Sequence, residues 1–200
     1  MAEMIDIFTE QNQKIGTVSK KEYYTYKGNN LPWINCTICY VINDSNKKII
    51  LQKRGECQSE AGKIECCSGH VRTGELPFQC AVRELGEELT IPENYAKNIH
   101  YLGKIKVDWA NLEDSSLRQP RKVSVYAYAL KLPDSSIIKK DGREVVALAE
   151  ATYDETKGFI ENNMTRFPYT EKLKPQYDEI FNELKNFMLS KNKVNERIKQ

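Results

Sequence analysis

The sequence from Gly69 to Ile91 reads GHVRTGELPFQCAVRELGEELTI, and it holds three closely spaced glutamates. Glu84, Glu87 and Glu88 are predicted to share one face of a helix, because a helix turns by about 100° per residue. Like charges at this spacing destabilise a helix by a few tenths of a kcal/mol per pair. Carboxylate oxygens are hard ligands that suit magnesium, manganese or calcium. The glutamates therefore predict a divalent metal site.

The opposite face of this helix carries an apolar stripe that can dock on a sheet. The stripe consists of Ala81, Val82, Leu85 and Leu89. Pro77 suits the first helical turn, and Pro92 stops the helix soon after Leu89. Gly69 and Gly74 punctuate the preceding segment, which predicts a loop with unusual backbone angles.

This stretch resembles the signature of the Nudix hydrolases: Gly, five residues, Glu, seven residues, Arg-Glu, an apolar residue, any residue, Glu-Glu, any residue, Gly and an apolar residue. The matching residues are Gly69, Glu75, Arg83, Glu84, Leu85, Glu87, Glu88 and Ile91. Thr90 stands where the pattern has its last glycine. A left-handed backbone, which glycine often supplies after a helix, costs threonine about 1 kcal/mol or more. The helix is therefore expected to end in another way.

The resemblance implies an α/β/α sandwich around a mixed sheet and a magnesium-dependent enzyme, with manganese as the alternative ion. The implied reaction is hydrolysis of a diphosphate bond in a nucleoside diphosphate linked to another moiety. The implied metal ligands are Glu84, Glu87, Glu88 and the carbonyl of Gly69. Arg83 would orient a neighbouring glutamate and Glu75 would pair with Arg83, because ligating carboxylates need hydrogen-bonded support.

The general base and the phosphate contact are less well defined. The base is Glu88 or Glu144, with Glu113 as a third candidate. Glu144 matches an acidic residue that begins a late strand in the family, although a surface charge on an edge strand explains it nearly as well. Arg54 ends a strand beside the motif, and its fork-shaped guanidinium suits a phosphate. A solvated charge at a strand end is the equal alternative.

Composition limits the classes of function. The chain has 200 residues, 40% of them hydrophobic, which is enough for one domain with extensions. Its net charge of +2 makes no strong case for binding nucleic acid or membranes. An acidic N-terminus and the lack of a long apolar run favour a cytoplasmic location. We expect an N-terminal β extension over 1–30, a Nudix domain over 31–165, and a C-terminal amphipathic helix with a tail over 166–200. The expected partner is a small diphosphate or nucleotide, and a homodimer is an open alternative.

Alternating apolar residues predict the strands of the sheet. The predicted strands are two short ones within 1–20, a hairpin over 34–42 and 48–54, and further strands over 63–67, 99–107, 122–130 and 143–148. Helices are predicted over 154–162 and from Pro175 onward. Segments 21–33 and 131–143 are predicted to be linker and loop. In the loop 108–121, Trp109 is interpreted as a core residue or as a stacking platform for a base.

Six cysteines need an explanation in such a chain. A zinc site built from Cys36, Cys39, Cys66 and Cys67 is disfavoured, because a strand points Cys36 and Cys39 to opposite faces. Reduced cysteines that act as small apolar residues are the default.

Two other functions remain as alternatives. Cys66 and Cys67, followed by His70, resemble the loop of isopentenyl diphosphate isomerases, which carries a catalytic cysteine just before a histidine. A Trp-Gly-Glu tract of the kind that supplies their second catalytic residue is missing. The other alternative is a non-catalytic module that senses nucleotides, although such a module does not need the full set of glutamates.

Overall fold

The computed structural model describes residues 2–26, 30–55, 62–109, 121–140, 144–165 and 167–190. Nine strands in these ranges form one mixed sheet. They are β1 (Met4–Phe8), β2 (Lys14–Ser19), β3 (Trp33–Asn43), β4 (Lys48–Arg54), β5 (Ile64–Glu65), β6 (Cys67–His70), β7 (His100–Asp108), β8 (Lys122–Leu132) and β9 (Val145–Ala151). The helices are α1 (Lys20–Thr25), α2 (Pro77–Leu89), α3 (Glu93–Ala96), α4 (Tyr153–Glu161) and α5 (Lys174–Leu189), with a short 3-10 helix η3 (Ser135–Ile137).

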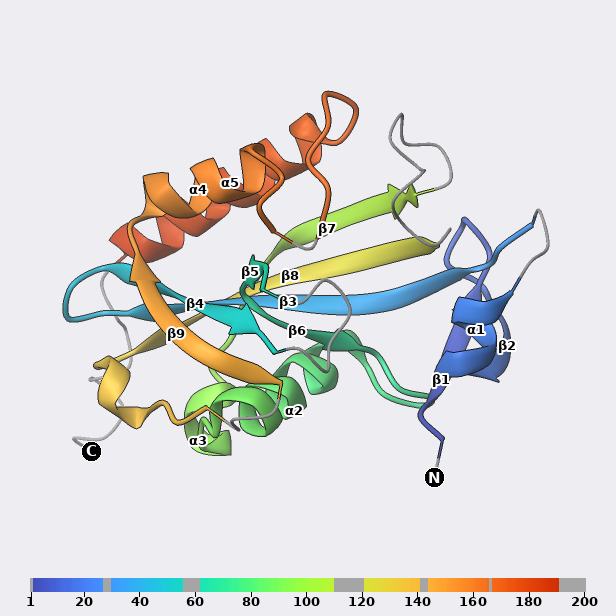
Figure 1. Ribbon diagram of the computed structural model, residues 1–200, viewed down its shortest axis with the longest axis horizontal. Coiled ribbons are helices and arrows are strands. Elements are labelled where there is room, and N and C mark those ends of the chain that lie inside the picture. Colours follow the sequence, from blue (N-terminus) through green and yellow to red (C-terminus); the bar gives the residue numbers. More distant parts are fainter. Residues whose placement is uncertain are drawn as a thin grey trace.

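β3 is the centre of the sheet, since all of its residues are buried. It pairs in parallel with β8 along its whole length, and antiparallel with β4 and β6. Alternate residues of β3 enter two separate apolar clusters: Ile38 packs with residues of α4 and α5, whereas Val41 packs with residues of α2. α4 and α5 therefore cover one face of the sheet, and α2 and α3 the other (Figure 1). The predicted α/β/α sandwich around a mixed sheet is confirmed.

Most predicted elements are present. The hairpin is β3 and β4, the later strands are β7, β8 and β9, and the two C-terminal helices are α4 and α5. α5 buries Tyr177, Ile180 and Phe181 on one side, as the helical spacing predicts. Segment 131–143 is not entirely loop, because β8 continues to Leu132 and η3 follows.

The N-terminal segment contains the two predicted strands, but the linker predicted over 21–33 is wrong. It begins as α1, because Ser19 and Glu22 form a capping box: Ser19 Oγ accepts from the Glu22 N–H at 3.2 Å, and Glu22 accepts from the Ser19 N–H at 2.8 Å. Tyr23 of α1 is buried, and its hydroxyl donates to the Pro32 carbonyl at 3.0 Å. Tertiary packing of this tyrosine thus orders a segment that looks polar in sequence.

Thr90 also departs from expectation, because it does adopt the left-handed backbone, with φ 52° and ψ 28°. The backbone N–H groups of Thr90 and Ile91 both donate to the Leu85 carbonyl. The Thr90 hydroxyl donates to the Lys139 carbonyl at 2.8 Å. This contact from a distant segment offsets the strain that threonine brings to such a helix end.

Two predictions about buried side chains are confirmed. Trp109 is 2% exposed and belongs to the cluster under α4 and α5, so it is a core residue. Cys36 and Cys39 lie in opposite clusters. The described cysteines are buried thiols that are not part of a disulfide, whereas Cys57 lies outside the described residues. None of the described helices combines the length and the apolar character that crossing a bilayer needs.

Candidate active site

Gly69 lies in β6 against the Glu84 side chain of α2. A Cβ atom on Gly69 would lie 1.9 Å from Glu84 Oε1, so a larger residue would displace that carboxylate. The prediction of a loop at Gly69 is wrong, since Gly69 pairs with Thr37 of β3 as a strand residue. Gly74, in the turn before α2, has the positive φ of 77°. The glycine at position 69 is therefore explained by the close approach of Glu84 rather than by backbone angles.

Glu88 points from α2 toward the sheet and is 6% exposed. Its Oε2 accepts hydrogen bonds from Gln52 Nε2 at 2.7 Å and from the Ser68 N–H at 3.3 Å. The Cys67 thiol also hydrogen-bonds to this carboxylate. Burial raises the pKa of Glu88 to about 8, and neighbouring carboxylates act in the same direction. Without a cation, Glu88 is therefore mostly protonated at neutral pH.

Glu84 is half-buried, and its carboxylate interacts electrostatically with the buried carboxylate of Glu88. Its Oε1 accepts a hydrogen bond from Arg83 Nη1 at 2.5 Å. Burial raises the pKa of Glu84 to about 7, although the guanidinium of Arg83 acts in the opposite direction. The charge of Glu84 in turn contributes to the raised pKa of Glu88. Ionising both groups together is therefore unfavourable.

Glu87 lies on the outer side of α2, with 48% of its side chain exposed. Its Oε2 is 3.2 Å from Arg72 Nη2 and 3.0 Å from Arg83 Nη1. Two guanidinium groups therefore offset the charge of Glu87 in this structure.

Arg83 connects α2 to the end of β6. It donates through Nε and Nη2 to the two oxygens of Glu75, at 2.8 and 3.0 Å, which is a bidentate pair. Nη2 also donates to the His70 carbonyl at 3.0 Å. The predicted pairing of Arg83 with Glu75 is present, and it holds Arg83 where it reaches Glu84.

Arg54 is 5% exposed and forms an ion pair with Glu65. The alternative of a solvated charge at a strand end is therefore wrong, because β4 lies between β5 and β9 at this point. Ser68 Oγ donates to the other oxygen of Glu65 at 3.2 Å. A contact between Arg54 and a phosphate stays a prediction.

Two buried polar residues, Gln52 and Glu65, are not among the predicted site residues. They lie directly opposite each other on β4 and β5. Gln52 continues the side of β4 on which Ile50 packs against α2. Glu65 stands between Ile64 and Cys66 in a short strand. A polar residue at an apolar position of a strand next to the motif, as at Gln52 and Glu65, could have identified both residues from the sequence.

The other candidate bases are less well placed or lie outside the described part. Glu144 is exposed and directly precedes β9. Its carbonyl accepts from the Gly55 N–H at 2.9 Å, which puts Glu144 beside the end of β4. Glu113 lies outside the described residues. The role of either residue as a base stays a prediction.

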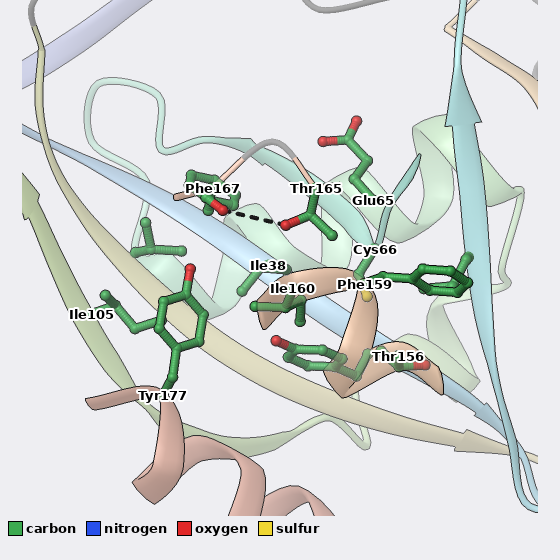
Figure 2. A pocket seen from close by; sticks show the side chains of 13 residues that line it. Ile38, Glu65, Cys66, Ile105, Thr156, Phe159, Ile160, Thr165, Phe167 and Tyr177 are labelled. Atoms are coloured by element: carbon green, nitrogen blue, oxygen red, sulfur yellow. Dashed lines mark hydrogen bonds between the residues drawn. The ribbon is translucent and has the colours of Figure 1, made fainter. Parts of the chain in front are cut away.

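A small cavity lies on the opposite face of the sheet, beneath α4 and α5 (Figure 2). Its walls are mostly apolar side chains, such as Ile38, Ile160 and Phe167. It offers about 20 Å³ to the centre of a water molecule, which is room for about one water. Glu65 lies at the top of Figure 2, and its carboxylate points away from the apolar side chains. Glu65 thus belongs both to the wall of this cavity and to the carboxylates near Glu88.

Cys66, Cys67 and His70, the residues that resemble an isomerase loop, are all buried. Burial raises the pKa of both Cys66 and Cys67, so their thiols are neutral at physiological pH. Cys66 lines the cavity. His70 is buried, and its Nε2 lies 2.6 Å from the Tyr24 hydroxyl. A catalytic role for these three residues stays a prediction.

The predicted metal ligands do not converge in this structure. Across the described ranges, no group of three or more His, Cys, Asp or Glu side chains is arranged to hold an ion, because Glu84 and Glu87 are turned toward arginines. The residues nevertheless fit a hard divalent cation. Within the same ranges Glu88 has no ion-pair partner, and the buried Gln52 Oε1 has no hydrogen-bond partner. Carboxylate and amide oxygens are the donors that magnesium and manganese prefer.

Comparisons with known proteins place this chain in a family. A family model described as the NUDIX domain matches residues 34–172. An uncharacterized Nudix hydrolase of Clostridium acetobutylicum is 31% identical over 166 residues, which cover 81% of this chain and 76% of that protein. The division of this chain near residues 30 and 165 stays a prediction.

Solved structures share the fold at low sequence identity. Protein DR0079 of Deinococcus radiodurans has a TM-score of 0.61 at 14% identity, covering 88% of this chain and 98% of that one. The MutT protein of Methanosarcina mazei has a TM-score of 0.54 at 16% identity, covering 79% and 96%. The NUDIX domain of Shewanella oneidensis NrtR, complexed with ADP ribose, has a TM-score of 0.52 at 11% identity, covering 84% and 99%. Since the family model spans most of the chain and a relative is 31% identical, the chain belongs to the Nudix family and is a hydrolase that acts on pyrophosphate bonds.

Proposed function

We propose that the protein uses magnesium to hydrolyse a diphosphate bond in a nucleoside diphosphate linked to another moiety. The observation that carries this proposal is that half-buried Glu84 and buried Glu88 carry interacting carboxylates on the helix of the Nudix signature. Two buried like charges are unfavourable unless a cation joins them. A diphosphate commonly binds together with such a cation.

Glu84, Glu87 and Glu88, with the carbonyl of Gly69, would hold Mg²⁺ or Mn²⁺. When bound, the ion neutralises part of the diphosphate charge and lowers the pKa of a water. Glu84 and Glu87 must turn away from their arginines to take part. Arg83 keeps its bidentate contact with Glu75 during this change, so its position is retained.

The reaction adds one water across the diphosphate. The water oxygen forms a bond to one phosphorus, the bridging phosphorus–oxygen bond breaks, and the bridging oxygen leaves with the other phosphate product. The proton of the water passes to a carboxylate. Glu88 is the first candidate, because its carboxylate lies in the same site as the proposed ion. Glu144 and Glu113 are the alternatives.

The proposed class of substrate is supported by a protein of the same fold, since the NrtR domain was solved with ADP ribose, a nucleoside diphosphate joined to a second group. In this chain, Glu65 links the carboxylates to the apolar cavity (Figure 2). We therefore propose that the organic group of the substrate lies beside Glu65 at the edge of this cavity. Arg54 is the proposed contact for a phosphate of the substrate. A cytoplasmic location and a homodimer stay predictions.

A screen of substrates with identified products tests this function. Nucleoside triphosphates, nucleotide sugars, dinucleoside polyphosphates, coenzyme A and dinucleotide cofactors are each incubated with and without Mg²⁺ or Mn²⁺. We expect two phosphorylated products from one class, and only with the ion present. The same release of products by a variant that carries both Glu87→Gln and Glu88→Gln would contradict the metal site.

The same screen separates the alternatives. An isomer of isopentenyl diphosphate, formed without release of phosphate, would favour the isomerase. A nucleotide that raises the melting temperature while no compound is cleaved would favour a sensing module.

A further inference from the structure

Gln52 occupies a position in β4 that the fold would otherwise fill with an apolar residue. It is 2% exposed, and Ile50, on the same side of β4, packs in the cluster under α2. Burying an amide is unfavourable unless both of its ends form hydrogen bonds. Packing alone therefore does not explain a glutamine here.

The nitrogen end of this amide holds Glu88. Gln52 Nε2 donates to Glu88 Oε2 at 2.7 Å, and the Ser68 N–H donates to the same oxygen at 3.3 Å. When Glu88 is ionised, as binding of a cation would require, its carboxylate only accepts hydrogen bonds and therefore faces the nitrogen of the amide and not its oxygen. The two donors on Oε2, together with the hydrogen bond from the Cys67 thiol, restrict rotation of the carboxylate.

The oxygen end of the amide lacks a partner. Gln52 Oε1 is buried, and no donor among the described residues reaches it. Buried acceptors without a donor are rare in native proteins, and each one needs a reason. A donor that arrives with a ligand, such as a water beside Glu88, would satisfy this oxygen.

We propose that Gln52 is a positioning residue for Glu88. Its Nε2 would fix the carboxylate so that Glu88 can bind the cation, and its own Oε1 would accept a hydrogen bond from a water in the same site. This inference rests on the proposed function, because it assumes that Glu88 binds a divalent ion. It requires Gln52 to act through Glu88 without touching the substrate.

Binding of Mn²⁺, followed by electron paramagnetic resonance of the free ion, tests this role without any turnover. Gln52→Met removes both ends of the amide at a similar volume. We expect the dissociation constant for Mn²⁺ to rise about 10–100-fold, as found when outer hydrogen bonds to metal ligands are lost. If Gln52→Met fails to fold, Gln52→Asn serves instead, because its amide is one methylene too short to reach Glu88.

Gln176→Met is the matched control. Gln176 also makes a hydrogen bond of 2.8 Å, accepting from the Lys106 N–H, but it lies on α5, on the other face of the sheet. Its loss should leave the affinity for Mn²⁺ unchanged. In a Glu88→Gln background, Gln52→Met should also have no further effect, because a residue that acts through Glu88 has nothing left to position.

Unchanged affinity in a folded Gln52 variant overturns the inference. Equal weakening by Gln176→Met, or undiminished weakening in the Glu88→Gln background, overturns it too, because either result shows a general structural effect. Wild-type protein that binds no Mn²⁺ overturns it together with the proposed metal site. If the Gln52 variants weaken binding as expected but wild-type protein cleaves no diphosphate compound, the positioning role stands and the proposed function fails.

Discussion

Glu87 and Glu88 are neighbours in sequence and lie in opposite environments. Glu88 faces the sheet, is 6% exposed, and is held by the uncharged donors of Gln52 and Ser68. Glu87 has a side chain that is 48% exposed and is paired with two arginines. The ionised form of the inner carboxylate is therefore unfavourable unless a cation binds, whereas solvent and guanidinium groups already stabilise the charge of the outer one.

The largest expected effect separates these two glutamates directly. Glu88→Gln should lower kcat for the magnesium-dependent reaction about 10²–10⁴-fold, the range for loss of a positioned acid–base group. Its melting temperature should stay the same or rise, because a neutral amide removes the penalty for a buried charge. Glu87→Gln should lower kcat by less, because Glu87 is already shared with arginines. Steady-state kinetics and calorimetry measure both variants. Equal losses of kcat would show that burial does not distinguish them.

The contrast between a buried and an exposed glutamate also applies to stability, through the ion pairs Arg54–Glu65 and Arg72–Glu87. Arg54→Met leaves Glu65 as an uncompensated buried charge, which typically costs about 3–5 kcal/mol. Arg72→Met removes an exposed partner of Glu87 and should change the free energy of unfolding by less than about 1 kcal/mol. Urea denaturation at neutral pH measures both. Unfolding of the two variants at the same urea concentration would contradict the expected difference between the buried pair Arg54–Glu65 and the exposed pair Arg72–Glu87.

The raised pKa values of Glu84 and Glu88 also predict how the stability of the protein depends on pH. Burial raises the pKa of Glu84 to about 7 and that of Glu88 to about 8, from the usual 4.5. The native state therefore binds more protons than the unfolded state between pH 4.5 and 8, so the stability of ion-free protein should fall as the pH rises through this window. The fall should reach a few kcal/mol in order of magnitude. Addition of Mg²⁺ should restore the loss, most strongly at pH 8. Denaturation curves with and without the ion test this, and a flat profile contradicts the inner charge pair.

A smaller effect on stability than that of Arg54→Met is expected at the glycine beneath Glu84. Gly69→Ala puts a Cβ atom 1.9 Å from Glu84 Oε1, so the flexible carboxylate must swing aside. We expect a loss of stability of about 1 kcal/mol, together with a clear loss of Mn²⁺ affinity and of kcat. Gly158→Ala is the matched control, because nothing lies within 4 Å of its added Cβ. Retained affinity in Gly69→Ala would show that Glu84 does not need its present position.

Prediction from sequence worked best where the signal is local. The apolar residues of α2 and α5 recur at helical spacing, and those of β3 and β8 alternate as in a strand. Each pattern lies within one element, so it predicts that element without knowledge of what packs against it. The same reasoning failed at Thr90 and at α1. Thr90 is held in a left-handed conformation by Lys139, and α1 is ordered by the buried Tyr23. In both cases a distant partner overrides local preference.

The candidate site shows the same division. The sequence of Gly69–Ile91 determined the helix, the family and the glutamates that can carry charge. It did not indicate which glutamate is buried, because all three lie within a narrow arc of one helix, and only the position of the sheet decides which of them loses water. Gln52, Glu65 and Arg54 enter the site from strands that only tertiary pairing brings beside α2. The tertiary structure therefore decides the electrostatics of the site, because desolvation depends on what packs against a carboxylate and not on its place in the chain.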